Sequence, residues 1–377
     1  MRRIIAVSLI LFFAFCGTAL AADDTVRIGV FLPLTGANAY GGQLELEGLQ
    51  MAHQEFPGVL GKTVELFIVD NKSDKVESAN AVKRLISKEK ALTIIGTYGS
   101  SLAMAGGEVA EKAGIPMVGT SCTNPLVTQG KKYVFRVCFI DPFQGAGAAT
   151  YAYKTLGLKK AALLVDVAND YSVGLASFFK RSFDKLGGQV VANLKYQSGD
   201  QDFTAQLTEI ISKKPDLLFI PSYFAEGAII MKQANELGAT FKIMGGDAMD
   251  NPKIVEIGGK DVEGFIHTTF PYDPSMKEMN PVARNFTDNW TKLHPDKEPN
   301  VNAALGYDSY VIVLDAIKRA GSLDSEAITN ALAATKGFEG VTGATTINAT
   351  HDAEKPVGLV VIKDGKKTYI GSITPEL

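Results

Sequence analysis

Cysteine and histidine are scarce in this chain, and no enzyme motif accompanies them. The 377 residues include three cysteines and four histidines. No two histidines have the spacing of a metal pair, and no third soft ligand lies near Cys122 and Cys138, so we expect no metal and no cofactor. A Gly-x-Ser-x-Gly elbow, a phosphate-binding loop and a dinucleotide fingerprint are all missing. Carboxylates that meet only in space stay open as an alternative, but we expect a protein that is not an enzyme.

Long apolar runs are missing as well. The longest, Ile4 to Phe15, has about a dozen residues, too few for the roughly 20 that a helix needs to cross a bilayer. Arg2 and Arg3 precede this run and Ala19-Leu20-Ala21 follows it, which is the pattern of a secretory signal peptide. We predict cleavage near Ala21 and an exported, periplasmic protein.

The charge balance excludes some classes of partner. Removal of residues 1–21 leaves 36 basic and 41 acidic side chains, a net charge of −5. A mildly acidic chain without a Lys/Arg cluster is not expected to bind nucleic acid or an anionic membrane. Cys16 follows Phe15 and not the small residue of a lipoprotein signal, so we expect no lipid anchor. Cys122 and Cys138 remain, each at the end of a predicted strand, and we predict that they form a disulfide.

Short apolar strands alternate with amphipathic helices in two consecutive sets. The first set has strands at 26–32, 64–69, 92–95, 115–118 and 133–139, with helices at 41–54, 76–87 and 102–112. The second has strands at 161–165, 189–196, 216–220, 241–244 and 264–269, with helices at 144–156, 173–186, 204–213 and 226–237. This alternation is typical of parallel, doubly wound sheets, so we predict an α/β protein with two Rossmann-like lobes.

The alternation stops after residue 274. Helices at 280–293, 302–320 and 325–335 follow, and then short strands near 345–347, 357–363 and 367–370. Helices without a sheet of their own are expected to cover the first lobe. We therefore predict crossings between the lobes near Asp141, Phe270 and Thr350, which form a hinge that closes on a ligand. The N-terminal lobe would comprise 22–141 and 271–350, and the C-terminal lobe 142–270 and 351–377.

Two hydroxyl-rich turns follow neighbouring strands of the first lobe. One is Gly96-Thr97-Tyr98-Gly99-Ser100-Ser101, and the other is Gly119-Thr120-Ser121-Cys122-Thr123-Asn124-Pro125. Ligands of doubly wound sheets lie at the carboxyl ends of the strands, where free backbone N–H groups favour anions. Together these turns are suited to hold one carboxylate. The alternative is that Ser100 and Thr123 are only helix caps.

The second lobe offers groups of complementary polarity. The strand at 241–244 ends in Gly245-Gly246-Asp247, and a carboxylate there would pair with an ammonium group. Tyrosines that can cover apolar ligand atoms occur at other strand ends or loops: Tyr40, Tyr171 and Tyr223. The alternatives are a turn aspartate and tyrosines in ordinary packing.

Several segments resemble the exported binding proteins of ABC transporters for branched-chain amino acids. They are 27–36 after the leader, Tyr40-Gly41, Gly48, Ile95-Gly96 before Ser100, Phe135-Arg136, Asp141, Gln144-Gly145, Tyr171, Asp202-Phe203 and Gly245-Gly246-Asp247. The resemblance covers essentially the whole chain after the leader. It implies a type I periplasmic-binding-protein fold, a small amino acid as ligand and an ABC membrane permease as partner of a monomeric receptor.

The resemblance also implies roles for single residues. Contacts of the ligand's α-carboxylate would be Ser100, Ser121 and Thr123. Contacts from the second lobe would be Tyr171, Tyr223 and Asp247, with Asp247, together with the Ser121 carbonyl, accepting from the α-ammonium. Tyr40 and Tyr98 would form walls of the side-chain pocket.

Some positions depart from the relatives that select leucine and valine. Asp247 stands where glutamate is usual, Tyr98 where a smaller apolar residue is common, and Asn302 near a position that is often aromatic. Ser73 and Gly99 replace the cysteines of the family's disulfide. A small or polar ligand side chain is therefore as plausible as leucine. An amide, urea or short carboxylate as ligand, and a sensory role, stay open as alternatives.

Overall fold

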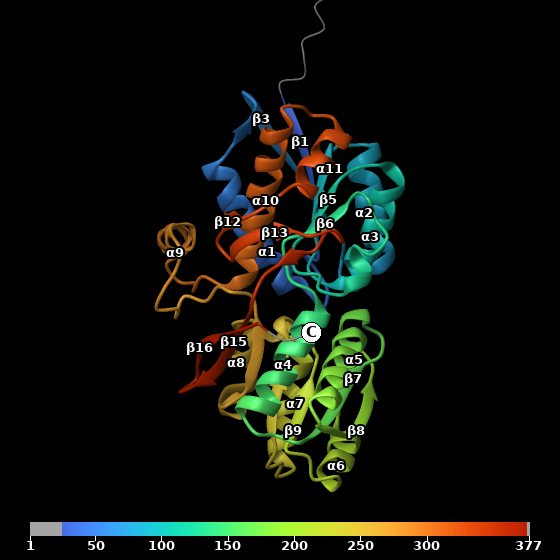
Figure 1. The fold of residues 1–377 in the computed structure, drawn as a ribbon, viewed down its shortest axis with the longest axis vertical. Helices are drawn as coiled ribbons and strands as arrows, with labels where there is room; N and C mark the ends of the chain where they lie inside the picture. Colours follow the sequence, from blue (N-terminus) through green and yellow to red (C-terminus); the bar gives the residue numbers. More distant parts are fainter. Residues whose placement is uncertain (1–24, 375–377) are drawn as a thin grey trace, which may run out of the picture.

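Residues 25–374 are described by a computed structural model, and they form two lobes stacked along the long axis of the molecule (Figure 1). The predicted signal peptide, its cleavage site and Cys16 lie outside these residues. Within residues 25–374 no helix has the length and apolar character needed to cross a membrane.

The N-terminal lobe is built on a sheet with the strand order β2-β3-β1-β4-β5-β6. Its strands are β1 (Thr25–Leu32), β2 (Gly58–Val59), β3 (Lys62–Asp70), β4 (Thr93–Ile95), β5 (Met117–Gly119) and β6 (Val134–Arg136). Its helices are α1 (Ala39–Glu55), α2 (Lys75–Ser87), α3 (Ser100–Ala113), α9 (Pro281–Leu293), α10 (Val301–Ala320) and α11 (Ser325–Ala333). The pairings that join β3, β1, β4, β5 and β6 are parallel, and the late helices share one buried core with this sheet.

The C-terminal lobe is built on a sheet with the order β16-β15-β11-β10-β9-β7-β8. Its strands are β7 (Lys160–Asp166), β8 (Gln189–Tyr196), β9 (Leu217–Ile220), β10 (Lys242–Gly245), β11 (Ile266–Thr269), β15 (Val357–Lys363) and β16 (Lys366–Ile373). Its helices are α4 (Asp141–Thr150, continued by a π-helical turn Tyr151–Thr155), α5 (Asp170–Lys185), α6 (Thr204–Ser212), α7 (Phe224–Glu236) and α8 (Lys253–Gly258). Short 3₁₀ turns occur at Pro125–Val127, Asp247–Met249 and Gly259–Val262.

The central strands of the C-terminal lobe are buried on both faces, which explains their continuous apolar sequence. Leu163 of β7 and Phe219 of β9 belong to one core cluster, whereas Leu164 and Leu218 belong to a second one. Successive side chains of a strand point to opposite faces, so these clusters lie on the two sides of the sheet. The predicted α/β, doubly wound fold with two lobes is confirmed.

The chain passes between the two sheets three times. The passages run from β6 to α4, from β11 to α9, and from the small sheet of β12 (Phe338–Gly340), β13 (Gly343–Ile347) and β14 (Ala353–Glu354) to β15. In Figure 1, α4 begins where the two lobes meet. The residue boundaries given above for the lobes stay a prediction.

Several elements differ from the sequence-based expectation. The strand expected at 133–139 spans only Val134–Arg136, because the following residues leave the sheet to reach the second lobe. The helix expected from 144 begins at Asp141, with Pro142 in its first turn, a position that proline favours. The short elements β2, β12, β14 and α8 were not predicted, since so few residues show no apolar period.

The predicted disulfide between Cys122 and Cys138 is wrong, because both residues are free, buried cysteines. The turns after β5 and β6 do bring the two residues together. Their register sets Cys138 Sγ opposite the backbone N–H of Cys122, from which it accepts a hydrogen bond of 3.4 Å. The Cys122 sulfur lies against Gly119, where an added Cβ would be 2.4 Å away from it.

Candidate functional site

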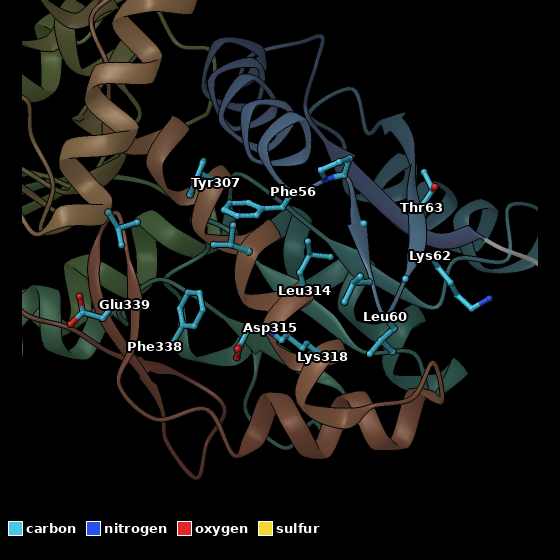
Figure 2. A pocket seen from close by; sticks show the side chains of 16 residues that line it. Phe56, Leu60, Lys62, Thr63, Tyr307, Leu314, Asp315, Lys318, Phe338 and Glu339 are labelled. Carbon is cyan, nitrogen blue, oxygen red and sulfur yellow. The ribbon is translucent and has the colours of Figure 1, made fainter.

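A hollow of about 910 Å³ on the N-terminal lobe does not contain the predicted site (Figure 2). It is lined by the end of α1, the turn between β2 and β3, α10 and β12, with apolar side chains such as Phe56, Leu60 and Phe338. None of the eight predicted ligand contacts lines it. Ser100, Thr123 and Asp247 lie elsewhere, after the carboxyl ends of β4, β5 and β10.

The two hydroxyl-rich turns of the N-terminal lobe are tied together. Ser100 Oγ accepts the backbone N–H of Asn124 at 3.1 Å, and the Thr123 carbonyl accepts the N–H of Asp141 at 2.8 Å. The residues that cap the two helices are Gly99 and Asn124, so the alternative that Ser100 and Thr123 are helix caps is wrong. Both side chains are buried, and Ser100 is the first residue of α3, whose N-terminus favours an anion.

Asp247 lies on the opposite side, directly after β10. It is almost buried, and its Oδ1 accepts hydrogen bonds from Tyr171 Oη, at 3.0 Å, and from Gln144 Nε2. Burial raises the pKa of Asp247 to about 6, although the hydrogen bonds from Gln144 and Tyr171 act in the opposite direction. Both of these bonds end on Oδ1, and within residues 25–374 no second residue donates to Asp247 Oδ2. Oδ2 therefore has acceptor capacity that other residues do not use, and contact of this oxygen with a ligand stays a prediction.

Tyrosine rings line the space between these groups. The Tyr223 ring is 5.6 Å from that of Tyr98 and 5.7 Å from that of Tyr171, centroid to centroid. Tyr98, from the N-terminal lobe, also donates from Oη to the Ala248 carbonyl of the other lobe at 3.4 Å. Tyr40 contacts the C-terminal lobe as well, with its ring 6.3 Å from that of Phe224. Tyr98 and Tyr40 thus span the interface between the lobes.

Asp170 joins the lobes at the rim of the site. Its Oδ2 accepts from Lys75 Nζ at 3.0 Å and from Ser101 Oγ at 2.8 Å, and its backbone N–H donates to Ser101 Oγ at 3.1 Å. The Asp170 carbonyl accepts from Asn124 Nδ2 at 2.8 Å. On another part of the interface, Asn302 of α10 donates to the Asp250 carbonyl at 3.2 Å. These contacts hold the two lobes in a closed arrangement.

The structure adds Gln144 and Asp141, whose roles sequence reasoning missed. They lie one turn apart at the start of α4, a spacing that could have indicated a shared direction. Neither carboxyl oxygen of Asp141 has hydrogen-bonding geometry to a partner, although the Thr123 hydroxyl lies near and lowers its pKa. Burial and the nearby Asp247 charge nevertheless raise the pKa of Asp141 well above its usual value.

Glu45 of α1 is a second group that was missed. Its carboxyl is hydrogen-bonded to Thr120 and Ser121, so the Ser121 hydroxyl already has a hydrogen-bond partner within the protein. The Ser121 carbonyl accepts the N–H of Gly99 at 3.2 Å. Glu45 shares the buried face of α1 with Leu49 and Ala52, and a glutamate at an apolar helix position was the available signal.

The arrangement is suited to reversible binding of a dipolar molecule. Hydroxyl and backbone donors lie on one lobe and a carboxylate acceptor lies on the other. No cluster of three or more His, Cys, Asp or Glu side chains that could hold a metal ion is found in the described part of the chain. Ligand contact stays a prediction for Ser100, Ser121, Thr123 and the other five residues.

Comparisons with known proteins agree with this architecture. Residues 25–367 match the family model described as periplasmic binding protein. The Leu/Ile/Val-binding protein homolog 3 of Brucella melitensis is 29% identical over 359 residues, which cover 93% of this chain and 94% of the relative. The Leu/Ile/Val-binding protein BraC3 of Rhizobium johnstonii is 30% identical over 338 residues, or 88% of this chain and 89% of the relative.

Solved structures give the same result. The leucine binding protein LivK of Thermotoga maritima is 47% identical with a TM-score of 0.90, covering 93% of this chain and 99% of that one. The branched-chain amino acid transporter substrate-binding protein LivJ of Streptococcus pneumoniae, solved in complex with isoleucine, is 32% identical with a TM-score of 0.87, covering 93% and 100%. The fold, the matched residues and these relatives lead to one conclusion: the chain belongs to the periplasmic binding protein family.

Proposed function

We propose that this protein is an exported, non-catalytic receptor that closes on a small α-amino acid and delivers it to an ABC permease. The lobes would close around the ligand and hold both of its charged ends. Leucine, isoleucine and valine are the first candidates, because the relatives are named for these ligands and one was solved with isoleucine.

The observation that carries the proposal is the opposition of unlike groups in one buried place. Asp247 is oriented by Tyr171 and Gln144 so that one carboxylate oxygen is left for an ammonium group. On the facing lobe, the turns that contain Ser100 and Thr123 provide donors for the ligand's carboxylate. A ligand that lacks either end would leave buried polar groups without partners, which costs about 1–3 kcal/mol for each group.

Asp247 provides the direct test. A thermal-shift screen of the common amino acids should identify the ligand, because a ligand that favours the native state raises the melting temperature. We expect micromolar or tighter binding, on the order of −8 kcal/mol. Asp247→Ala should weaken it at least tenfold, measured by titration calorimetry. Asp296→Ala, which removes an exposed carboxylate, is the matched control and should bind normally. Equal affinity of Asp247→Ala and the unchanged protein would remove Asp247 from the site.

A ligand without an ammonium group is the second candidate. A solute-binding protein of R. palustris, solved with benzoate, shares the fold at a TM-score of 0.84 but only 24% identity. Benzoate and other short carboxylates therefore belong in the same screen. Their binding should be insensitive to Asp247→Ala, which distinguishes them from a zwitterion. Product formation from any bound compound would instead indicate an enzyme.

Export and transport have their own measurements. The amino terminus of the mature protein should be near Ala22, which sequencing of the secreted form would establish. Deletion of the gene should slow ligand uptake and growth on that amino acid as sole nitrogen source. A sensor would change the response to the ligand and leave uptake unaltered.

A further inference from the structure

Glu45 is a fully buried carboxyl group without a counter-ion. Its Oε2 lies 2.6 Å from Thr120 Oγ1, and its Oε1 is hydrogen-bonded to Ser121 Oγ. No cation contributes to its surroundings within residues 25–374. An ionised carboxylate is costly to bury in this way, whereas a neutral carboxylic acid can accept from one hydroxyl and donate its single proton to the other.

The titratable groups that face Glu45 are the Tyr98 hydroxyl after β4, the Cys122 thiol after β5 and the Cys138 thiol after β6. Burial raises the pKa of Tyr98 well above its usual value, and the hydrogen bond with Cys138 does the same for Cys122. Burial also acts to raise the pKa of Cys138, but the hydrogen bond from Cys122 and the Arg136 charge leave it below its usual value. The helix α10 presents the backbone of Gly306, where an added Cβ would be 2.0 Å from the Glu45 carbonyl oxygen. Burial raises the pKa of Glu45 to about 8, against the hydrogen bonds from Ser121 and Thr120.

The burial of the two hydroxyls orders the protons of this cluster. Thr120 is 0% exposed, so its proton has to be used inside the cluster, on Glu45 Oε2. Ser121 Oγ is hydrogen-bonded to Oε1, and an ionised Glu45 accepts this bond from Ser121. In a neutral Glu45 the acid proton on Oε1 would be donated to Ser121 Oγ, and Ser121, which is 7% exposed, would keep its own proton for a third group.

We propose that Glu45 is a proton-dependent positioning residue, which in its neutral form makes the Ser121 hydroxyl a donor to the ligand's carboxylate. This inference rests on the proposed function of the cleft. In the ionised form both hydroxyls would donate to Glu45, and Ser121 would offer only lone pairs. A negative charge would also lie one hydrogen bond away from the ligand's carboxylate, and like charges repel.

The consequence is a loss of affinity at alkaline pH. A carboxylate ligand and an ionised Glu45 exclude each other, so binding takes up a proton once Glu45 titrates. At acidic and neutral pH Glu45 stays neutral and has no such effect. The Glu45→Gln variant keeps a neutral side chain of the same shape at every pH, so it should lack this alkaline loss.

The test is the dissociation constant of isoleucine from pH 6 to pH 9.5, measured by calorimetry for the unchanged protein and Glu45→Gln. The ligand's own ammonium titrates equally in both, so the ratio of the two constants isolates Glu45. We expect the ratio to be constant up to pH 7 and to change by about tenfold by pH 9. The change arises because the unchanged protein loses affinity and Glu45→Gln does not. A ratio that stays constant over the whole range would overturn the inference.

Melting temperatures without ligand separate positioning from a structural role. If Glu45 only stabilises the fold, the two melting curves diverge with pH while the ratio of dissociation constants stays flat. A second measurement needs no variant: calorimetry in two buffers of different ionisation enthalpy should show uptake of about half a proton at pH 8. Absence of uptake at pH 8 would also overturn the inference.

The two proposals fail differently. If no amino acid binds at pH 7, the proposed function is wrong, and this inference falls with it. If isoleucine binds at pH 7 but the ratio is flat, only the role of Glu45 is wrong.

Discussion

The buried carboxyl groups between the lobes differ in what surrounds each of them. Asp250 is paired with Lys367 Nζ at 2.6 Å, and this cation, with His267 and Thr269, keeps its pKa below the usual value despite burial. Asp247 has only neutral donors, Gln144 and Tyr171. It is therefore a group that an incoming cation can stabilise and that a proton can block.

The affinity for an amino acid should fall in acid because of Asp247. The ligand's ammonium binds the ionised carboxylate, so protons compete with it below the pKa of about 6. We expect the dissociation constant to rise by about fivefold between pH 6 and pH 5. Calorimetry over this range would measure it, and Asp247→Asn should show no such rise. A flat profile for the unchanged protein would contradict the role of Asp247.

Tyr171 should determine the pH at which the affinity for the amino acid begins to fall in acid. Tyr171→Phe removes a hydrogen bond that favours the ionised Asp247, so the pKa rises and the loss of affinity moves to higher pH. Tyr153→Phe removes a hydroxyl elsewhere in the same lobe and is the control. The same pH profile in Tyr171→Phe and the unchanged protein would show that Tyr171 does not position Asp247.

At the scale of elements, α1 and α10 pack with their backbones in close approach. A Cβ at Gly306 would be 2.0 Å from the Glu45 carbonyl oxygen, and one at Gly48 would be 1.9 Å from that of Ala303. Only glycine allows this approach, which brings Glu45 and Asn302 to the site from segments far apart in the sequence.

Gly306→Ala should destabilise the protein by about 1–3 kcal/mol, because the helices have to separate. The melting temperature measures this change. Gly107→Ala on α3 is the control, since its Cβ would have no neighbour nearer than 3.6 Å and alanine is the better helix former. Equal melting temperatures of Gly306→Ala and the unchanged protein would show that the helix pair can adjust.

At the scale of the whole molecule, Asp170 contributes to the balance between open and closed lobes. It is partly buried, which raises its pKa, but the hydrogen bonds from Lys75 and Ser101 leave the pKa below the usual value. This contribution to closure is present above the ordinary carboxyl pKa and is lost only as the pH falls through the lower value. It is therefore constant at neutral pH.

Asp170→Ala should shift the population toward the open form and weaken apparent affinity by about threefold, since exposed ion pairs contribute little. Small-angle scattering of the liganded protein would measure the shift toward the open form, and the dissociation rate would measure the loss of affinity. Asp184→Ala is the matched control, because Asp184 lies on the same helix and pairs only within it, with Lys180. Unchanged scattering and affinity in Asp170→Ala would contradict a closing role.

Local pattern was enough for most of the fold and for the places that the predicted contacts take along the chain. The period of apolar residues predicts the strands and helices, and the carboxyl end of β10 places Asp247, because these features depend on neighbours in the sequence. The same reasoning failed for short elements such as α8, which have no measurable period.

The sequence by itself determined the α/β architecture, the position of the hydroxyl-rich turns and the place of Asp247 just after β10. Only the tertiary structure decided that Cys122 and Cys138 stay free, that Ser121 bonds to Glu45, and that Asp170 joins the lobes. The physical reason is distance along the chain. Register between turns, helix approach at a glycine and closure of two lobes join residues that no local pattern relates to one another.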